Sequence, residues 1–336
     1  GIIVHRARIF PRFNSNKFFI SINYLSFVFF GIIKVLFVSG KFDRIFIYAP
    51  SPITVGLVGI FASIKFNSKS FLWVQDLWPE SVSEAGNINN GILIKILNIL
   101  TKYIYNNVDH ILVQSKFFIK NLSEKNIDEK KITYLPNYAD DVYLKVKQPI
   151  KKYNYFSVTF AGNVGEAQNL EVLISVCKIL KNKSEKIIFI IIGTGRNLNN
   201  LKHKIIESEV KDYFKFLGRK EQNLMPSYFD NSDVMLISLK KSKIFSLTIP
   251  SKLQSYMAYG MPIVGSISGI SNTIINESGA GFATEPNDIQ GLADNIIRLK
   301  NMSNDQLVQL GKNSKKYYVK NFSKKIIVDR LFKILR

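Results

Sequence analysis

A lysine near the start of an expected helix is the first feature that suggests chemistry. The segment IPSKLQSYMAYGMPIVGS predicts a helix over residues 250–258 that Gly260 ends. Because the helix dipole is positive at its beginning, a cation there is unfavourable unless an anion binds beside it. A phosphate oxygen would be held by the free N–H groups of Ser251 and Lys252 together with the Lys252 ammonium group. The alternative is a surface lysine that bends outward into water.

Two glycine-containing turns each follow an expected strand and precede an expected helix. FAGNVGEAQNL contains Gly162, Asn163, Gly165 and Gln168, and IIGTGRNLNNL contains Gly193 and Gly195. Glycine permits tight turning and close approach of a ligand to the backbone, and the helix start offers N–H groups to an anion. An ordinary turn is an equally good interpretation of either loop alone. Two such loops at one sheet edge fit a nucleotide better than an isolated phosphate, although neither matches the G-x-G-x-x-G or Walker pattern.

Charged and aromatic residues follow an expected strand in the first half of the chain, in LWVQDLWPESV. Asp76 is the best-placed carboxylate of this half, and Glu80 follows it. Such residues at the carboxyl end of a strand are typical of a ligand cleft. N-capping of the next turn is an equally good role for Asp76. Ser51 and Pro52 in YAPSPITVG hold a similar position, where they either line the cleft or cap the following helix.

Alternating strands and helices must position these residues. Strands are expected at 2–9, 44–49, 70–75, 109–113, 132–135, 157–161, 187–192, 214–217, 234–237 and 262–265. Helices are expected at 53–64, 92–105, 116–123, 170–181, 197–208, 250–258, 271–275 and 289–300. This alternation predicts an α/β protein with parallel sheets and right-handed crossovers.

The polar segment 137–156 contains Pro149 and is interpreted as a linker. We therefore expect two Rossmann-like domains, residues 1–150 and 151–336, that face each other across a cleft. Ligands would bind at the carboxyl ends of their strands. The stretch 306–336 is expected to be helical and to cross back over the first domain. Residue Gly1 begins the chain abruptly within an expected strand, which suggests that a preceding segment of the natural protein is missing.

The composition favours anionic partners but excludes few classes of function. Lys and Arg number 46 against 25 Asp and Glu, which gives a formal net charge of +21. The abundance of Ile, Asn and Lys can also reflect genome composition. The single cysteine, Cys177, lies in an apolar run and is expected in the core. One Cys and three His make a Cys/His metal site improbable.

An apolar stretch of bilayer length occupies residues 18–38. Asn23 and Lys34 interrupt it, so a transmembrane helix is the least favoured interpretation. The two favoured ones are a buried helix and a helix lying on a membrane surface, with Lys17, Lys34 and Lys41 near the headgroups.

A series of motifs carries a resemblance to a known family. APSPITVGL, QDLWPESV, YLPNYAD, FAGNVGEAQNL, IIGTG, FLGR, NSDVMLISL and IPSKLQSYMAYGMPIV occur in this order between Tyr48 and about Gly281. Together they resemble the family 4 retaining glycosyltransferases of GT-B architecture. The most similar subgroup is that of the L-fucosamine transferases (WbuB-like) of bacterial surface polysaccharide synthesis, which includes lipopolysaccharide O-antigen and capsule.

The resemblance implies a hexosyltransferase that moves a sugar from a nucleotide diphosphate, most often UDP, with retained anomeric configuration. The second domain would bind the donor, and the first domain a glycan or polyprenyl-diphosphate-linked acceptor. The family's opening strand and glycine-rich loop are absent from this sequence. Neither a cofactor nor a metal is expected, because Lys252 and helix dipoles would stabilise the leaving diphosphate.

Some family positions carry other residues in this sequence. The Arg and Lys of the loop after the second domain's first strand correspond to Asn163 and Gln168, and the Glu-x7-Glu motif corresponds to Ser246 and Gln254. Gln254 would then hydrogen-bond the donor ribose without charge. Arg219 is either a second phosphate ligand or a structural residue. Asp76 would orient the acceptor hydroxyl or accept its proton, with Ser51, Pro52 and Glu80 nearby.

Two other functions remain compatible with the sequence. A sugar-nucleotide 2-epimerase shares the two-domain architecture, although the three histidines lie at unpromising positions. A non-catalytic binder of membrane surfaces or nucleic acid would use the positive charge, but no zinc finger, RRM or helix-turn-helix pattern is present. For the transferase, a cytoplasmic location is expected, with peripheral attachment to the inner face of an anionic membrane as one possibility.

Overall fold

The computed structural model describes residues 1–13, 17–86, 90–144 and 154–336. The chain forms two compact units, Gly1–Pro136 with Arg330–Arg336, and Asn137–Asp329. The expected domain boundary between residues 150 and 151 lies outside the described residues.

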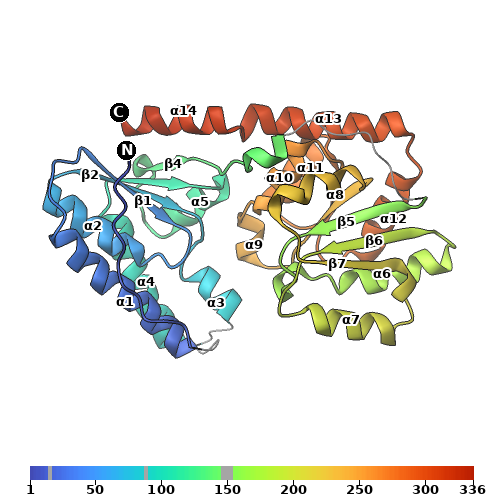
Figure 1. The fold of residues 1–336 in the computed structure, drawn as a ribbon, viewed down its shortest axis with the longest axis horizontal. Helices are drawn as coiled ribbons and strands as arrows, with labels where there is room; N and C mark the ends of the chain where they lie inside the picture. The colour runs from blue at the N-terminus through green and yellow to red at the C-terminus, as the bar shows by residue number, and fades with distance from the viewer. Residues whose placement is uncertain (14–16, 87–89, 145–153) are drawn as a thin grey trace. The chain divides into compact units, whose positions relative to one another are not determined.

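The first unit contains a parallel sheet with the strand order β1-β2-β3-β4 in its described residues (Figure 1). Its strands are β1 (Arg44–Ala49), β2 (Lys69–Val74), β3 (His110–Val113) and β4 (Ile132–Tyr134). Its helices are α1 (Lys17–Leu36), α2 (Val55–Phe66), α3 (Glu80–Gly86), α4 (Gly91–Asn106) and α5 (Lys116–Glu124). β1 and β2 pair in register from Arg44–Lys69 to Ala49–Val74, so their carboxyl ends lie at one edge of the sheet.

Two expectations for the first unit need correction. The strand predicted over residues 2–9 is absent, since residues 1–13 contain neither helix nor strand. No strand of the described sheet pairs with this segment, and its backbone instead contacts α1, where Phe10 N donates to Ser26 Oγ at 2.9 Å. By length and composition alone, α1 is long and apolar enough to cross a membrane. Only 17% of its most apolar stretch is buried inside the protein, whereas a core helix would be mostly buried. The interpretation of α1 as a buried core helix is therefore wrong.

The second unit contains a parallel sheet with the strand order β10-β9-β8-β5-β6-β7 (Figure 1). Its strands are β5 (Phe156–Ala161), β6 (Ile187–Ile192), β7 (Phe214–Gly218), β8 (Val234–Ser238), β9 (Ile263–Ser266) and β10 (Gly281–Thr284). β6 has the sequence IIFIII and is nearly all buried, as is typical of a central strand of a parallel sheet. The expected α/β fold with parallel sheets is confirmed.

Helices cover both faces of this second sheet. α6 (Val172–Asn182), α7 (Leu198–Glu207) and α12 (Ile289–Lys300) share one hydrophobic core with one face. α8 (Met225–Asp230), α10 (Ser251–Tyr259), α11 (Ile270–Glu277) and α13 (Asn304–Asn321) pack on the other face. Cys177 is buried in the α6 core, as expected, and burial raises the pKa of its thiol.

The strand order creates a switch point beside β5. The chain runs from β5 through β6 to β7 and then returns to β8, which pairs with the other side of β5. In open parallel sheets, ligands bind in the crevice outside the carboxyl ends of the strands at such a point. The topology therefore predicts a ligand site near the residues that follow β5 and β8.

The segment interpreted as a linker is partly ordered on the second unit. Ala139 and Tyr143 are buried, and the Tyr143 ring stacks on Phe229 with 5.6 Å between centroids. Ala139 N also donates to the Tyr318 hydroxyl at 3.2 Å. Polar composition suggested a solvated connection, but the aromatic and small residues of 137–144 form part of the second core. Residues 145–153 of the segment lie outside the described residues, and Phe156, at its end, is already the first residue of β5.

The helical stretch expected at the C-terminus is two helices, α13 and α14 (Lys324–Leu335), which are separated at Phe322 and Ser323. Ser303 caps α13 by accepting a hydrogen bond from Gln306 N at 3.3 Å. The last residues belong to the first unit, where Arg44 Nε donates to Leu335 O at 2.9 Å.

Candidate functional site

The loops after β5, β6 and β7 are joined by their backbones. Gly162 N donates to Ile192 O at 2.9 Å, and Val164 N donates to Thr194 O at 2.9 Å. Gly193 N donates to Gly218 O at 2.8 Å. The hydrogen-bonded ladder of the sheet thus continues past the strands into the loops, which fixes the loops relative to one another.

Glycine is required where the first two loops meet. Gly193 has φ +138°, and a Cβ atom built on it would lie 1.8 Å from Gly162 O. A Cβ atom on Gly195 would lie 2.2 Å from Val164 O. The sequence suggested that these glycines admit a ligand to the backbone. In the structure, their first effect is to let the two loops pack on each other.

We expect Gly193→Ala to lower the free energy of unfolding by about 3 kcal/mol, because it adds a backbone clash to an unfavourable φ. Gly218→Ala is the matched control, since Gly218 also has a positive φ (+68°) but no atom within 4 Å of its built Cβ. It should cost only about 1–2 kcal/mol. Urea unfolding of both variants measures the difference, and equal losses would contradict the packing role of Gly193.

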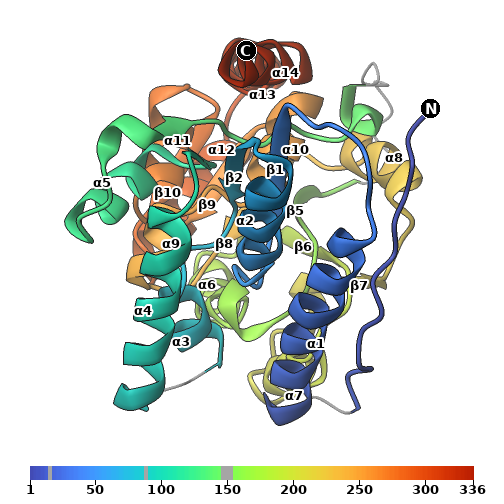
Figure 2. The ribbon, with the colours of Figure 1, turned by 90° about the vertical axis from the view of Figure 1, so that its left-hand side faces the viewer.

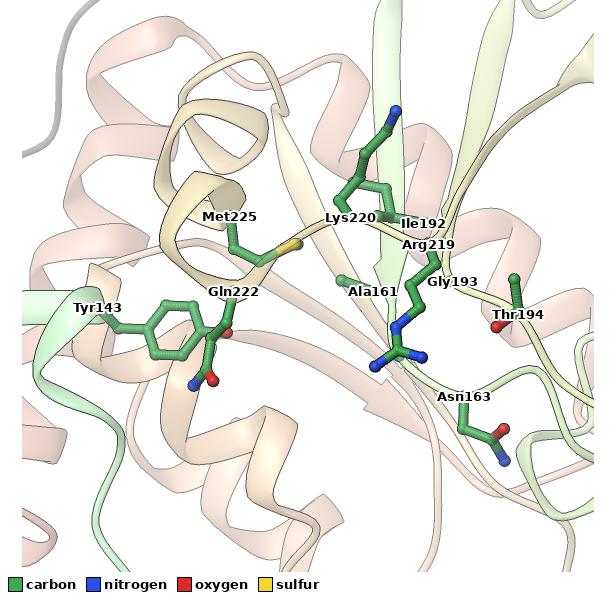
Figure 3. Close-up of a pocket in the computed structure, with 11 residues that line it drawn as sticks. Tyr143, Ala161, Asn163, Ile192, Gly193, Thr194, Arg219, Lys220, Gln222 and Met225 are labelled. Atoms are coloured by element: carbon green, nitrogen blue, oxygen red, sulfur yellow. The ribbon is translucent and has the colours of Figure 1, made fainter.

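A pocket of about 400 Å³ opens at the ends of these strands. It is lined by Tyr143, Ala161, Gly162, Asn163, Ile192, Gly193, Thr194, Arg219, Lys220, Gln222 and Met225. Figure 3 shows the Arg219 guanidinium group directed toward Asn163, whereas the Lys220 ammonium group points away. Tyr143 and Gln222 lie together at the other end of the pocket. The pocket thus combines a cation, amide groups and an aromatic ring.

Lys252 lies directly beside the first glycine loop. Its Nζ is 4.0 Å from the centroid of the Phe160 ring, and a Cβ built on Gly162 would be 3.2 Å from the same nitrogen. Nζ is buried and has no hydrogen-bond partner among the described residues. Burial lowers the pKa of Lys252 to about 7, because an ammonium group is poorly solvated there. A buried cation without an anionic partner is well suited to bind an anionic ligand.

The other residues expected at the donor site are used within the protein. Gln254 is fully buried, and its Nε2 donates to Asn137 O at 2.7 Å. Gln168 Oε1 accepts from Gly165 N at 2.9 Å, so this side chain holds the first glycine loop. Ser251 is exposed at the start of α10. The structure thus brings Gly162, Asn163, Gly193 and Arg219 to one pocket, with Lys252 beside it. Gln168 and Gln254 do not line this pocket and bond to the backbone instead.

In the first unit, the expected residues follow β1 and β2. Burial raises the pKa of Asp76, which lies two residues after the end of β2. Ser51 Oγ accepts from the indole N–H of Trp78 at 3.3 Å, so the loops after β1 and β2 are linked. Pro52 is buried. Glu80 Oε1 forms an ion pair with Lys125 at 2.6 Å, which gives this carboxylate a structural role.

Several pocket residues were not identified from the sequence. Thr194, Lys220, Gln222 and Met225 follow β6 and β7, and Tyr143 belongs to the segment interpreted as a linker. The more general rule that ligands bind outside the carboxyl ends of parallel strands, applied to β6 and β7, would have found Thr194, Lys220 and Gln222. Within the described ranges, no group of three or more His, Cys, Asp or Glu side chains could hold a metal ion.

Comparisons with known proteins agree with this architecture. The family described as "Glycosyl transferases group 1" matches residues 144–317. The probable glycosyltransferase WbjE of Pseudomonas aeruginosa is 27% identical over 284 residues, which cover 80% of this chain and 68% of WbjE. The Escherichia coli UDP-Gal:alpha-D-GlcNAc-diphosphoundecaprenol alpha-1,3-galactosyltransferase is 26% identical over 63% of this chain and 55% of its own length. The chain thus spans about two thirds of one relative and about half of the other.

Among solved structures, Anabaena HepE in complex with UDP and glucose is similar, with a TM-score of 0.67 and 15% identity. The similarity covers 87% of this chain and 77% of HepE. At this identity the likeness concerns the fold, which is the GT-B fold with two parallel α/β units.

Proposed function

Because the chain belongs to the group 1 glycosyltransferases, we propose that it transfers a sugar from a UDP-linked donor bound at the pocket of the second unit. Family membership decides against the 2-epimerase and the non-catalytic binder. HepE, which has the same fold, was solved with UDP and glucose. A relative in Escherichia coli is named "Putative colanic acid biosynthesis glycosyltransferase WcaL", which supports a role in polysaccharide synthesis.

The observation that carries the proposal is the position of the Lys252 ammonium group. It lies against Gly162 at the switch point of the sheet, buried and without a hydrogen-bond partner in the described chain. When the sugar leaves, negative charge develops on the diphosphate oxygens. A preorganised cation in a site of low polarity stabilises that charge in the transition state without reorganisation. Lys252 and the start of α10 would supply this stabilisation.

The pocket beside Lys252 would hold the rest of the nucleotide. Its volume of about 400 Å³ is adequate for a small ligand. Arg219 points into the pocket toward Asn163 and is placed to contact a phosphate group, while Tyr143 and Gln222 offer a ring and an amide group at the far end (Figure 3). We assign the diphosphate to the Lys252 and Arg219 end and the nucleoside to the remainder.

The acceptor would bind to the first unit, with Asp76 as the residue that orients its hydroxyl group. Burial raises the pKa of Asp76, which makes its carboxylate a stronger base than a solvated one. A same-face displacement would retain the anomeric configuration without an enzyme nucleophile. The named substrate of the Escherichia coli galactosyltransferase is a diphosphoundecaprenol-linked sugar. A lipid-linked acceptor, and with it an enzyme at the cytoplasmic face of the membrane, is therefore our proposal for this chain.

The proposed donor sugar is based on the sequence motifs that resemble the L-fucosamine transferase subgroup. QDLWPESV and IPSKLQSYMAYGMPIV resemble the L-fucosamine transferases, so a UDP-linked fucosamine derivative is the proposed donor sugar. A transfer assay with a panel of UDP-sugars tests the identity of the donor sugar separately from the transferase activity.

Calorimetric titration with UDP-glucose and GDP-glucose at pH 7.0 and pH 8.5 tests the donor site. The diphosphate of a nucleotide sugar keeps its charge over this range, whereas Lys252, with a pKa of about 7, loses its proton. Binding must then take up a proton, so we expect the association constant for UDP-glucose to fall about tenfold between the two pH values. We expect GDP-glucose to bind more weakly than UDP-glucose at both pH values.

Lys252→Met is the control for this titration and should bind UDP-glucose weakly, with no pH dependence. Tight and pH-independent binding by the unmodified protein would contradict the role of Lys252. Absence of binding by either nucleotide sugar would contradict the proposed donor site itself.

A further inference from the structure

Helix α4 presents a row of apolar side chains to solvent. Ile92, Ile96, Ile99 and Tyr103 are 73%, 55%, 71% and 51% exposed. Their spacing of four, three and four residues places them on one side of the helix. The opposite side is packed, since Thr101, Ile104 and Tyr105 are buried. The helix therefore is apolar on the face that the fold leaves uncovered, and we call these four residues the α4 stripe.

This pattern differs from that of α12 in the second unit. α12 buries Leu292, Ala293, Ile296 and Leu299 and exposes Asp294. An outward row of three isoleucines cannot be explained by packing within the described chain, because none of them is buried in it. Exposed apolar rows of this kind mark interaction surfaces.

The charges of α4 indicate which partner fits. The helix has no Asp or Glu, and its two charged residues are Lys95 and Lys102. Helical periodicity places both lysines on the same flank of the α4 stripe, and both are exposed. Long lysine side chains at the border of an apolar face extend to lipid phosphates while the face enters the acyl region.

A second helix of the first unit has similar chemistry. α1 also lacks acidic residues, and Phe18, Leu25, Phe29 and Leu36 are between 53% and 65% exposed. α1 and α4 both contact α2 (Figure 2). Apolar, acid-free surface is thus present on two helices that each pack against α2.

We propose that the α4 stripe binds the surface of an anionic lipid bilayer, with Lys95 and Lys102 at the level of the headgroup phosphates. This proposal rests on the proposed function only in that a lipid-linked acceptor requires the enzyme at a membrane. A second copy of the chain is a poorer partner. Two α4 helices packed through their stripes would bring four lysines together with no carboxylate on either helix to pair with them.

Co-sedimentation with vesicles tests the proposal. The unmodified protein should bind vesicles that contain phosphatidylglycerol and bind pure phosphatidylcholine vesicles at least tenfold more weakly, because each lysine near an anionic surface contributes about 1 kcal/mol. Ile96→Asp/Ile99→Asp should lose binding by at least tenfold. Ile206→Asp is the matched control, since Ile206 is an isoleucine of α7 that is 61% exposed. It should bind as the unmodified protein does.

Lys95→Gln/Lys102→Gln should remove most of the preference for phosphatidylglycerol. Equal vesicle binding by the Ile96→Asp/Ile99→Asp variant and the unmodified protein would overturn the proposal. The proposal would also be overturned if the unmodified protein did not bind vesicles and instead formed a dimer in sedimentation velocity that Ile96→Asp/Ile99→Asp dissociates. UDP-glucose titration of the same variants separates the two proposals, because vesicle binding without nucleotide binding would refute only the donor site. Unchanged circular dichroism verifies folding of each variant.

Discussion

Replacing Lys252 by methionine is expected to lower kcat for sugar transfer by a hundredfold or more. The substitution keeps a flexible apolar chain of similar length but removes the buried ammonium group beside Gly162. Loss of one preorganised group that stabilises transition-state charge commonly costs about 3 kcal/mol. Single-turnover transfer measurements at saturating UDP-sugar would detect the loss in the chemical step separately from weaker donor binding.

The same substitution should stabilise the nucleotide-free protein. Burial lowers the pKa of Lys252 from 10.5 to about 7, so between these values the unfolded chain holds a proton that the folded chain lacks. Stability then rises with pH through this window, and the full cost of the buried charge is present below pH 7. We expect Lys252→Met to gain about 1–3 kcal/mol at pH 7 and to lose the pH dependence.

Lys211→Met is the matched control for both measurements. Lys211 is exposed and precedes β7, so it lies at the amino edge of the sheet that carries the pocket at its carboxyl edge. Its replacement should leave transfer and stability nearly unchanged. If Lys252→Met retained full activity, the buried ammonium group would have no part in catalysis.

Asp76→Asn should lower transfer by at least a hundredfold while the affinity for UDP-sugar stays the same. The amide preserves size and some hydrogen bonding but cannot accept the acceptor's proton, and general base catalysis typically contributes about 10²- to 10⁴-fold. Donor affinity should persist because the pocket residues belong to the second unit and Asp76 to the first. Parallel transfer assays and UDP-sugar titrations separate these two effects.

Asp43→Asn is the control for Asp76→Asn, since Asp43 is exposed just before β1, at the opposite edge of the first sheet. It should leave transfer unchanged. A fully active Asp76→Asn enzyme would exclude Asp76 as the base. A variant that lost donor binding together with transfer would instead show that Asp76 acts through folding.

The strands of both sheets other than β10 could be predicted, because buried parallel strands are short apolar runs between turn residues. β10, with the sequence GFAT, is not such a run and was not predicted. The run IIFIII at β6 and the run VMLIS at β8 are examples in which almost every side chain is buried. The segment 2–9 has the same appearance and is not a strand. Composition shows only that a segment can form a strand. Whether it pairs depends on an available sheet edge, and the local sequence gives no information about that edge.

The sequence could indicate those residues of the proposed site whose types are unusual at their positions. Gly162, Gly193 and Lys252 stood out because glycine and a helix-start lysine are unusual enough to need a reason. Tyr143 could not be found in this way, since its place beside the pocket depends on stacking with Phe229, which lies far away in the sequence. The hydrogen bond from Gln254 to Asn137 O is likewise a long-range contact.

The burial of Cys177 has a practical consequence for chemical labelling. The sequence contains one cysteine, and its thiol is enclosed in the α6 core with a raised pKa, so it is a poor nucleophile toward maleimides. A cysteine introduced at an exposed position would therefore carry a fluorophore or spin label alone, without prior removal of the native residue. Probes could thus be attached to either unit, one introduced cysteine at a time, while Cys177 stays in place.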